Sequence, residues 1–211
     1  NDLREASLRR TVDSAIRNAR LLGADNSSLS LPLPSAYGKV CSYFANTAEY
    51  SAASRAKQVQ IICREAAGGG YKAGGFFSTE CLETAVANTH GLFAYYPQTV
   101  AEMNVFFTSR NGAGFASACS ADVSTIYGEA LAKKAAGRMA RSELRTIDPG
   151  EYPVVLEPDA VSEMLSFLAA YGFSAAAVQM NQDSTGLGSK CLSEKISIWD
   201  DGLSQIGRAS C

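Results

Sequence analysis

The stretch from residue 71 to residue 120 most constrains what this chain can fold into, because its apolar residues alternate with polar ones. This period of two is typical of strands with one buried face. Turn-forming residues interrupt it at 88–91 (Asn-Thr-His-Gly) and at 111–114 (Asn-Gly-Ala-Gly). The pattern predicts an antiparallel meander with strands at 71–77, 82–88, 92–96, 99–110 and 115–120.

Helical spacing of apolar residues flanks this meander on both sides. It predicts helices over 3–22, 52–67 and 124–141, and a further helix that Pro158 opens after a strand at 152–156. We expect Gly68-Gly69-Gly70 to end the second helix, and a short last strand within 191–201. Because the strands are consecutive and do not alternate with helices, the fold class predicted is α+β, an antiparallel strand meander flanked by helices.

The composition excludes two classes of partner. The formal net charge is -2 and no basic block occurs, so nothing supports a nucleic-acid partner. No apolar run approaches the roughly 20 residues that a membrane span requires. The six cysteines form no CxxC pair, and we expect reduced, mostly buried thiols in a cytoplasmic protein.

Few residues outside this framework carry chemistry. His90 is the single histidine and lies in a predicted turn, so a turn residue facing water is favoured over a general base. The run Ser184–Ser189 has no second histidine to serve a serine nucleophile, and Asp200-Asp201 is typical of a solvated turn. An unusual hydrolase that pairs Cys or Ser with His90 is one functional hypothesis that these residues leave open.

Three segments together resemble the TldD/PmbA family, known as microcin-maturation proteases and once called modulators of DNA gyrase. They are ETAVANTHGLFAYYPQTVAEMNVFF at 83–107, PGEYPVVLEPDAVSEMLSFLAAYGFSA at 149–175 and SEKISIWDDG at 193–202. The resemblance covers roughly residues 3–202 and implies a fold like the family's N-terminal region. It also implies the division 1–150 (helices, meander, helix), 151–202 (strand-helix-strand, the protease-motif segment) and 203–211 (an atypical tail). By this resemblance the chain looks truncated.

In the catalytic branch of the family, the strand-to-helix segment leads into a His-Glu-x-x-x-His motif that binds a metal. With the register set on Val155–Pro158, those three positions fall on Ser166, Phe167 and Tyr171, and none of these side chains supplies an imidazole or a carboxylate. The resemblance therefore implies the PmbA-like (TldE-like) branch, which lacks the motif. We expect no metal in this chain and zinc only in a TldD-like partner.

The first hypothesis is thus a metal-free component of a peptide-processing protease, inactive alone, in a dimer or hetero-oligomer with a TldD-like subunit. Residues Asn88, Gly91, Ser166 and Tyr171 are the candidate peptide-binding positions, placed by the resemblance. The alternative is a non-enzymatic peptide-binding or regulatory module, or an inactive family fragment. Its meander would accept an extended peptide at an open strand edge.

Overall fold

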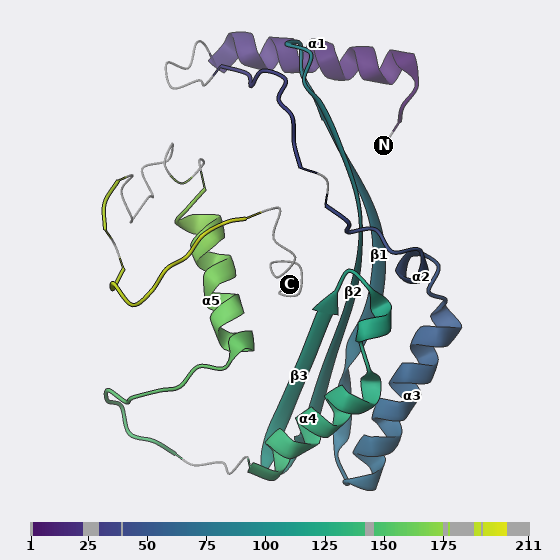
Figure 1. Ribbon diagram of the computed structural model, residues 1–211, viewed down its shortest axis with the longest axis vertical. Helices are drawn as coiled ribbons and strands as arrows, with labels where there is room; N and C mark the ends of the chain where they lie inside the picture. Colours follow the sequence, from purple (N-terminus) through teal and green to yellow (C-terminus); the bar gives the residue numbers. More distant parts are fainter. Residues whose placement is uncertain are drawn as a thin grey trace. The chain divides into compact units, whose positions relative to one another are not determined.

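The structure is a computed structural model that describes residues 2–22, 30–38, 40–141, 146–174, 177, 188–190 and 192–201. The chain separates into two units, residues 1–33 and 34–211. The elements are α1 (Glu5–Leu22), α2 (Ala45–Ala48), α3 (Ala52–Gly68), β1 (Lys72–Ala87), β2 (Phe93–Ser109), β3 (Gly112–Ser120), the 3-10 turn η1 (Val123–Thr125), α4 (Gly128–Arg141) and α5 (Pro158–Tyr171) (Figure 1). The α+β class, with an antiparallel sheet flanked by helices, is confirmed.

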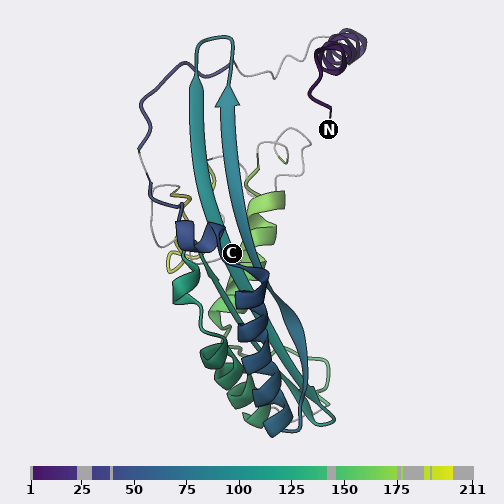
Figure 2. The ribbon, with the colours of Figure 1, turned by 90° about the vertical axis from the view of Figure 1, so that its right-hand side faces the viewer.

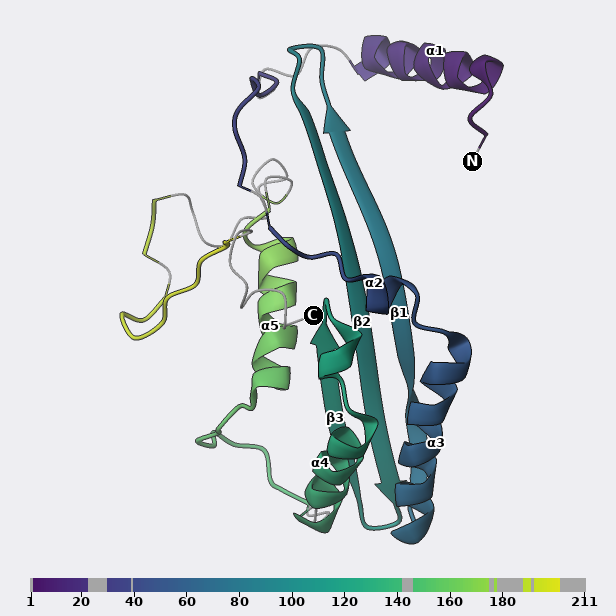
Figure 3. The ribbon, with the colours of Figure 1, turned by 45° about the vertical axis from the view of Figure 1, so that its right-hand side comes forward.

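The sheet has the order β1-β2-β3, and both pairings are antiparallel. The prediction of five short strands is wrong in number, because 71–77 and 82–88 form the single strand β1 and 92–96 and 99–110 form β2. Pro97 does not break β2, since β3 pairs with β2 only over Ala101–Ser109 and so does not extend to the proline. The hairpin of β1 and β2 therefore continues well past the end of β3 (Figure 3).

Glycine and asparagine residues lie in the two turns of the sheet and at the end of α3. At Asn88–Leu92, Gly91 has φ +85°, and the Asn88 Oδ1 accepts hydrogen bonds from the backbone N–H of His90 at 3.0 Å and Leu92 at 3.1 Å. Gly70 has φ +70° directly after α3, as predicted for a helix end. The second turn is at Arg110-Asn111, one step earlier than predicted, because Ser109 already pairs with Gly112.

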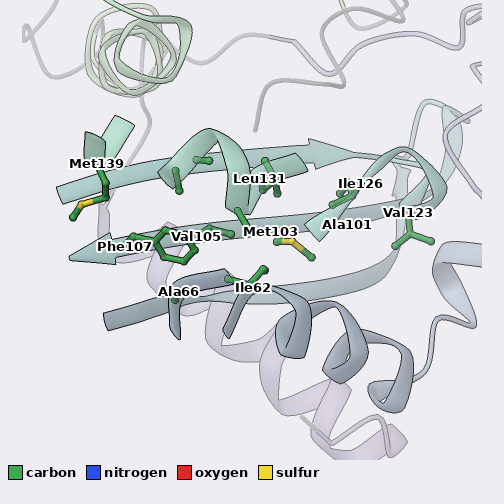
Figure 4. Packing of buried hydrophobic residues seen from close by; sticks show 13 residues of the cluster. Ile62, Ala66, Ala101, Met103, Val105, Phe107, Val123, Ile126, Leu131 and Met139 are labelled. Carbon is green, nitrogen blue, oxygen red and sulfur yellow. The ribbon is translucent and has the colours of Figure 1, made fainter. Parts of the chain in front are cut away.

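One face of the sheet carries the core. Alternate β2 residues from Thr99 to Phe107 are buried there, and α3 and α4 lie side by side over this face (Figure 2). The buried cluster consists of Ile62, Ala66, Ala101, Met103, Val105, Phe107, Ala116, Val123, Ile126, Leu131, Ala132, Ala135 and Met139 (Figure 4). Helices from both sides of the meander in sequence thus share one core.

The opposite face of the sheet is open and more polar. Glu102 and Asn104 of β2 lie there opposite Cys119 and Ser117 of β3. Phe106 and Phe115 make a ring pair on the same face, with centroids 4.6 Å apart. This open face positions the candidate site.

Buried threonines tie the segment before α2 to the end of β3. The Thr99 hydroxyl donates to the Ala121 carbonyl at 2.8 Å and accepts from the Phe44 N–H at 3.1 Å, while the Thr47 hydroxyl donates to the same carbonyl at 2.9 Å. Both side chains are almost fully buried, so these bonds satisfy groups that water cannot reach. These hydrogen bonds hold α2 and the segment before it against the end of β3 and the start of η1.

Two predicted strands do not form. Residues 151–157 form no strand, and Val155 is 97% exposed. The described residues 192–201 likewise contain no strand. A run of β-branched residues gives the same sequence pattern whether or not a partner strand is available, so the pattern alone predicts more strands than form.

The cysteine prediction is also wrong in two respects. Cys41, Cys63 and Cys81 are exposed, and Cys119 is disulfide-bonded.

No helix in the described part of the chain is long and apolar enough to cross a membrane.

Asp122 caps η1 and makes stability depend on pH. Hydrogen bonds from the Asn46 amide, at 2.6 Å, and from Ser124 lower the pKa of Asp122 below its ordinary value. A carboxyl whose pKa is lowered in the folded state adds stability above its unfolded pKa, near 4, and loses it as the pH falls through the lower, folded pKa. We therefore expect the melting temperature of Asp122→Asn to fall less steeply than that of the unchanged protein as the pH is lowered from 5 through this range. Asp148→Asn, in a loop, is the control, and an unchanged slope in Asp122→Asn would contradict the assignment.

Candidate functional site

A polar cavity of about 290 Å³ lies between the open face of the sheet and the first half of α5. Its lining combines carboxylates, hydroxyls and an amide, and the Asn104 Nδ2 donates to the Glu102 Oε1 at 3.0 Å. The lining residues are Glu102, Asn104, Phe115, Ser117, Ala118, Cys119, Pro158, Asp159, Ser162, Glu163 and Ser166. Such a surface can offer hydrogen-bond acceptors to a polar or cationic group.

The N-terminus of α5 is fixed to the sheet and to α4 by one ionic cluster. Asp159 accepts from the Ser117 hydroxyl at 2.8 Å and from Arg138 Nη1 at 3.3 Å, and Arg138 also pairs with Glu157. The Arg138 guanidinium donates in addition to the Phe115 carbonyl on β3. Because Arg138 and Asp159 are only 23% and 29% exposed, this cluster is better shielded than a surface ion pair.

Replacing Arg138 tests this anchor. In Arg138→Ala the Phe115 carbonyl and the half-buried Asp159 both lose the guanidinium, although Asp159 keeps its hydrogen bond from the Ser117 hydroxyl, and we expect this to cost about 1–3 kcal/mol of unfolding free energy. Hydrogen exchange should accelerate at the amides of residues 157–165. Lys133→Ala is the matched control, since its pair with Glu129 is exposed and is worth under about 0.5 kcal/mol. Unchanged exchange at α5 in Arg138→Ala would contradict the anchoring role.

A second, apolar cavity of about 940 Å³ lies between α5 and the segment 198–200. Aliphatic and aromatic side chains form most of its wall, and the Asp200 carboxylate lies among them. The lining residues are Leu156, Pro158, Val161, Ser162, Leu165, Ser166, Ala169, Phe173, Ile198, Trp199 and Asp200. Pro158, Ser162 and Ser166 line both cavities, so one edge of α5 separates the polar cavity from the apolar one.

The positions carried over from the metal motif lie on different sides of α5. Ser166 lines the cavities, and its hydroxyl donates to the Ser162 carbonyl at 2.9 Å. Phe167 and Tyr171 stack on each other with centroids 6.1 Å apart, and neither lines the described cavities. At about 100° per residue, Ser166 and Tyr171 are about 140° apart around the helix.

Asn88 and Gly91 lie elsewhere. They form the hairpin turn at the far end of β2, nine residues along that strand from Glu102, which is about 30 Å. Both are used by the turn itself, Asn88 through its side-chain bonds and Gly91 through its positive φ. His90 lies in the same exposed turn, as predicted. The structure thus brings together none of these turn residues with Ser166 or Tyr171.

The residues at the three metal-motif positions of α5 do not fit a zinc ion. Within the described ranges, no group of three or more His, Cys, Asp or Glu side chains could hold a metal. The positions where the family's ligands would lie offer a hydroxyl already bonded to the backbone and two stacked rings. No chemical step through a metal in this chain follows from this arrangement.

Sequence reasoning missed the anchor formed by Arg138 and Asp159. The sequence pattern singles out neither residue. The signal available was an acidic residue directly after Pro158, but its partner lies 21 residues away. Only the packing of α4 against β3 brings the two side chains together.

Comparison with known proteins adds an assignment to this geometry. Residues 149–211 match a family described as the PmbA/TldA metallopeptidase C-terminal domain. The fold is similar to that of TldE from Thermococcus kodakarensis, with a TM-score of 0.57 and 19% identity over 66% of this chain and 33% of that one. At this identity the likeness establishes the fold alone, and the chain spans about a third of the length of that structure. No curated protein matches the chain.

The chain is therefore an α+β protein that is similar in fold to TldE over about two thirds of its length and whose residues 149–211 match a metallopeptidase-family domain. The match over residues 149–211 supports a relationship of this part of the chain to the TldD/PmbA family.

Proposed function

We propose that the chain is the metal-free, TldE-like component of a peptide-processing metallopeptidase complex in the cytoplasm. The observation that carries the proposal is the surface of α5 inside the matched metallopeptidase segment. Its carried-over positions present Ser166, Phe167 and Tyr171, whose hydroxyl groups and ring systems cannot replace two imidazoles and a carboxylate. A chain with this helix contributes peptide binding and shape, and a TldD-like partner contributes the zinc.

The cavities beside α5 suggest how such a component takes part. A polar cavity and an apolar cavity meet at Ser162 and Ser166, so an extended peptide crossing this edge would meet an acceptor-rich wall and then an apolar one. Ser166 is the candidate contact of the original four that this geometry favours. Tyr171, Asn88 and Gly91 remain candidates on the resemblance alone.

The decisive experiment mixes the purified chain with a TldD-like metallopeptidase and follows both association and cleavage of an unstructured peptide. We expect no chelator-sensitive cleavage by the chain alone, a stable complex by light scattering, and faster cleavage by the pair than by the metallopeptidase alone. Chelator-sensitive cleavage by the isolated chain would overturn the proposal. So would the lack of any complex.

The alternative, a non-enzymatic peptide-binding module, predicts a different pair of results. Peptide would bind the chain, measured by fluorescence anisotropy, while no TldD-like subunit would bind at any concentration tested. Ser166→Asp is useful in both cases, since a carboxylate beside Asp159 and Glu163 should weaken binding of an acidic peptide more than that of a basic one. Ala170→Asp, an exposed change on the same helix, is its control.

A further inference from the structure

The outer edge of β1 has no strand partner in the described part of the chain, because β1 is the first strand in the order β1-β2-β3. The strand is 16 residues long, from Lys72 to Ala87. An edge of this length presents unpaired backbone N–H and C=O groups that favour pairing with another strand. The isolated hairpin beyond β3 is also the part of a sheet that is least stable in water without additional cover.

The protein covers the other edge of the same hairpin. Where β3 no longer reaches, the Thr99 N–H donates to the Ser42 carbonyl at 2.9 Å, and the Ser42 hydroxyl donates to the Pro97 carbonyl at 3.2 Å. The chain before α2 therefore flanks β2, while no described strand does the same for β1 (Figure 2). The asymmetry singles out β1 as the edge that a partner would occupy.

We propose that β1 pairs with β1 of a second copy of this chain, antiparallel, about a two-fold axis at Cys81. Symmetry restricts the possible registers. A two-fold axis that relates antiparallel strands within one sheet is perpendicular to the sheet, so it keeps each side chain on its face and places one residue opposite its own copy. The register is therefore decided by which residue lies on the axis.

Charge and backbone conformation favour Cys81 for that position. Glu80 and Glu83 are the only charged residues between 73 and 87, and an axis on either would oppose two carboxylates. An axis at Thr79 or earlier places Gly75, whose φ of +139° departs from extended backbone, inside the ladder. An axis at Leu82 or later leaves Phe76 without a residue of β1 opposite it.

With Cys81 on the axis, the cross-strand neighbours are compatible. Phe76 lies opposite Val86 of the second copy, twice by symmetry, and both side chains are about half exposed in the single chain. Glu83 lies opposite Thr79, and Glu80 lies opposite Leu82, so no like charges meet. The paired stretch runs from residue 76 to residue 86, so Gly75 lies just outside it, and the pairing covers apolar groups that the hairpin otherwise leaves in water.

A native thiol on the axis provides the test. Residues directly opposite in an antiparallel pair have Cα atoms about 4.5–5.5 Å apart, a spacing that a disulfide spans. Copper–phenanthroline, as the oxidant, should take two electrons from the two Cys81 thiols, with release of two protons, and give a covalent dimer on a non-reducing gel. Cys81→Ser should abolish it and Cys63→Ser should not. Thr79→Cys in the Cys81→Ser background should not restore it, since residues 79 lie four positions, about 13 Å, out of register.

Two substitutions at neighbouring positions, Cys81→Lys and Leu82→Lys, distinguish this interface from any other. We expect light scattering to give twice the 22.3 kDa chain mass for the unchanged protein. Cys81→Lys puts two ammonium groups opposite each other and should weaken the dimer about ten-fold or more, whereas Leu82→Lys puts each ammonium opposite Glu80 and should preserve it. A monomer at all concentrations, or a dimer equally insensitive to both changes, would overturn the proposal. Neither result bears on the association with a TldD-like subunit, which is assayed separately.

Discussion

Replacing Phe107 by alanine should lower the unfolding free energy by about 3–5 kcal/mol, the largest loss we expect from any single side chain of this protein. Phe107 is 0% exposed, and its ring stacks on Tyr71 with centroids 5.8 Å apart. Phe107 lies on β2 directly opposite Gly114 of β3, the glycine that contacts α4. The truncation would leave a cavity that neither the sheet nor the two helices can collapse to fill. Urea unfolding followed by circular dichroism measures the change.

Phe106 is the matched control for this prediction. It is the preceding residue on the same strand, but its side chain lies on the open face and is 47% exposed. Phe106→Ala should cost about 1 kcal/mol or less, mainly through the lost ring contact with Phe115. Equal losses in the two variants would mean that the assignment of the two faces of the sheet is wrong.

A valine at Gly114 should be the second most damaging change. A Cβ at this position would meet the backbone carbonyl of Ala135 and would lie 2.9 Å from the backbone nitrogen of Met139, both on α4. Backbone atoms cannot rotate away as a side chain does, so α4 must move off β3. We expect a loss at or above the upper end of the roughly 1–3 kcal/mol that overpacking usually costs.

The displacement of α4 has a consequence at the site as well. Arg138 lies on the same helix and holds Asp159, so Gly114→Val should accelerate hydrogen exchange at the start of α5 as Arg138→Ala does. Ala113→Val, at the neighbouring exposed position, is the control and should change neither quantity measurably. Wild-type stability in Gly114→Val would refute the close contact between α4 and β3.

The positions of α1, α3, α5 and the hairpin turn were predictable because local signals determine them, whereas the short α2 was not predicted and α4 begins at Gly128, four residues later than expected. Ser51 caps α3 by accepting from the Ser54 N–H, and Gly70 with its positive φ follows the end of that helix. The number of strands was not predictable in the same way. Short polar runs such as Ser78–Glu80 resemble breaks in sequence, but continuous pairing with β2 carries β1 through them.

The site was only partly predictable for a related reason. The absence of metal ligands on the helix after Pro158 could be read from residue types alone, once the register was set. The partners of that helix could not. Glu102 and Asn104 of β2 and Ser117 of β3 line the cavity with Asp159 only because the sheet orders these strands side by side and α5 lies against their open face.

The sequence by itself determined where α1, α3 and α5 lie, that the middle of the chain forms consecutive antiparallel strands, and that the helix 158–171 carries no histidine. These properties depend on residue type and on contacts within a few positions, which a linear pattern records. Tertiary structure alone decided that the long hairpin extends beyond β3, that β1 has no strand partner on its outer side among the described residues, that 152–156 forms no strand, and that Arg138 anchors Asp159. Those features depend on which distant segments are available to pair, and the free energy of such contacts arises only when the segments meet.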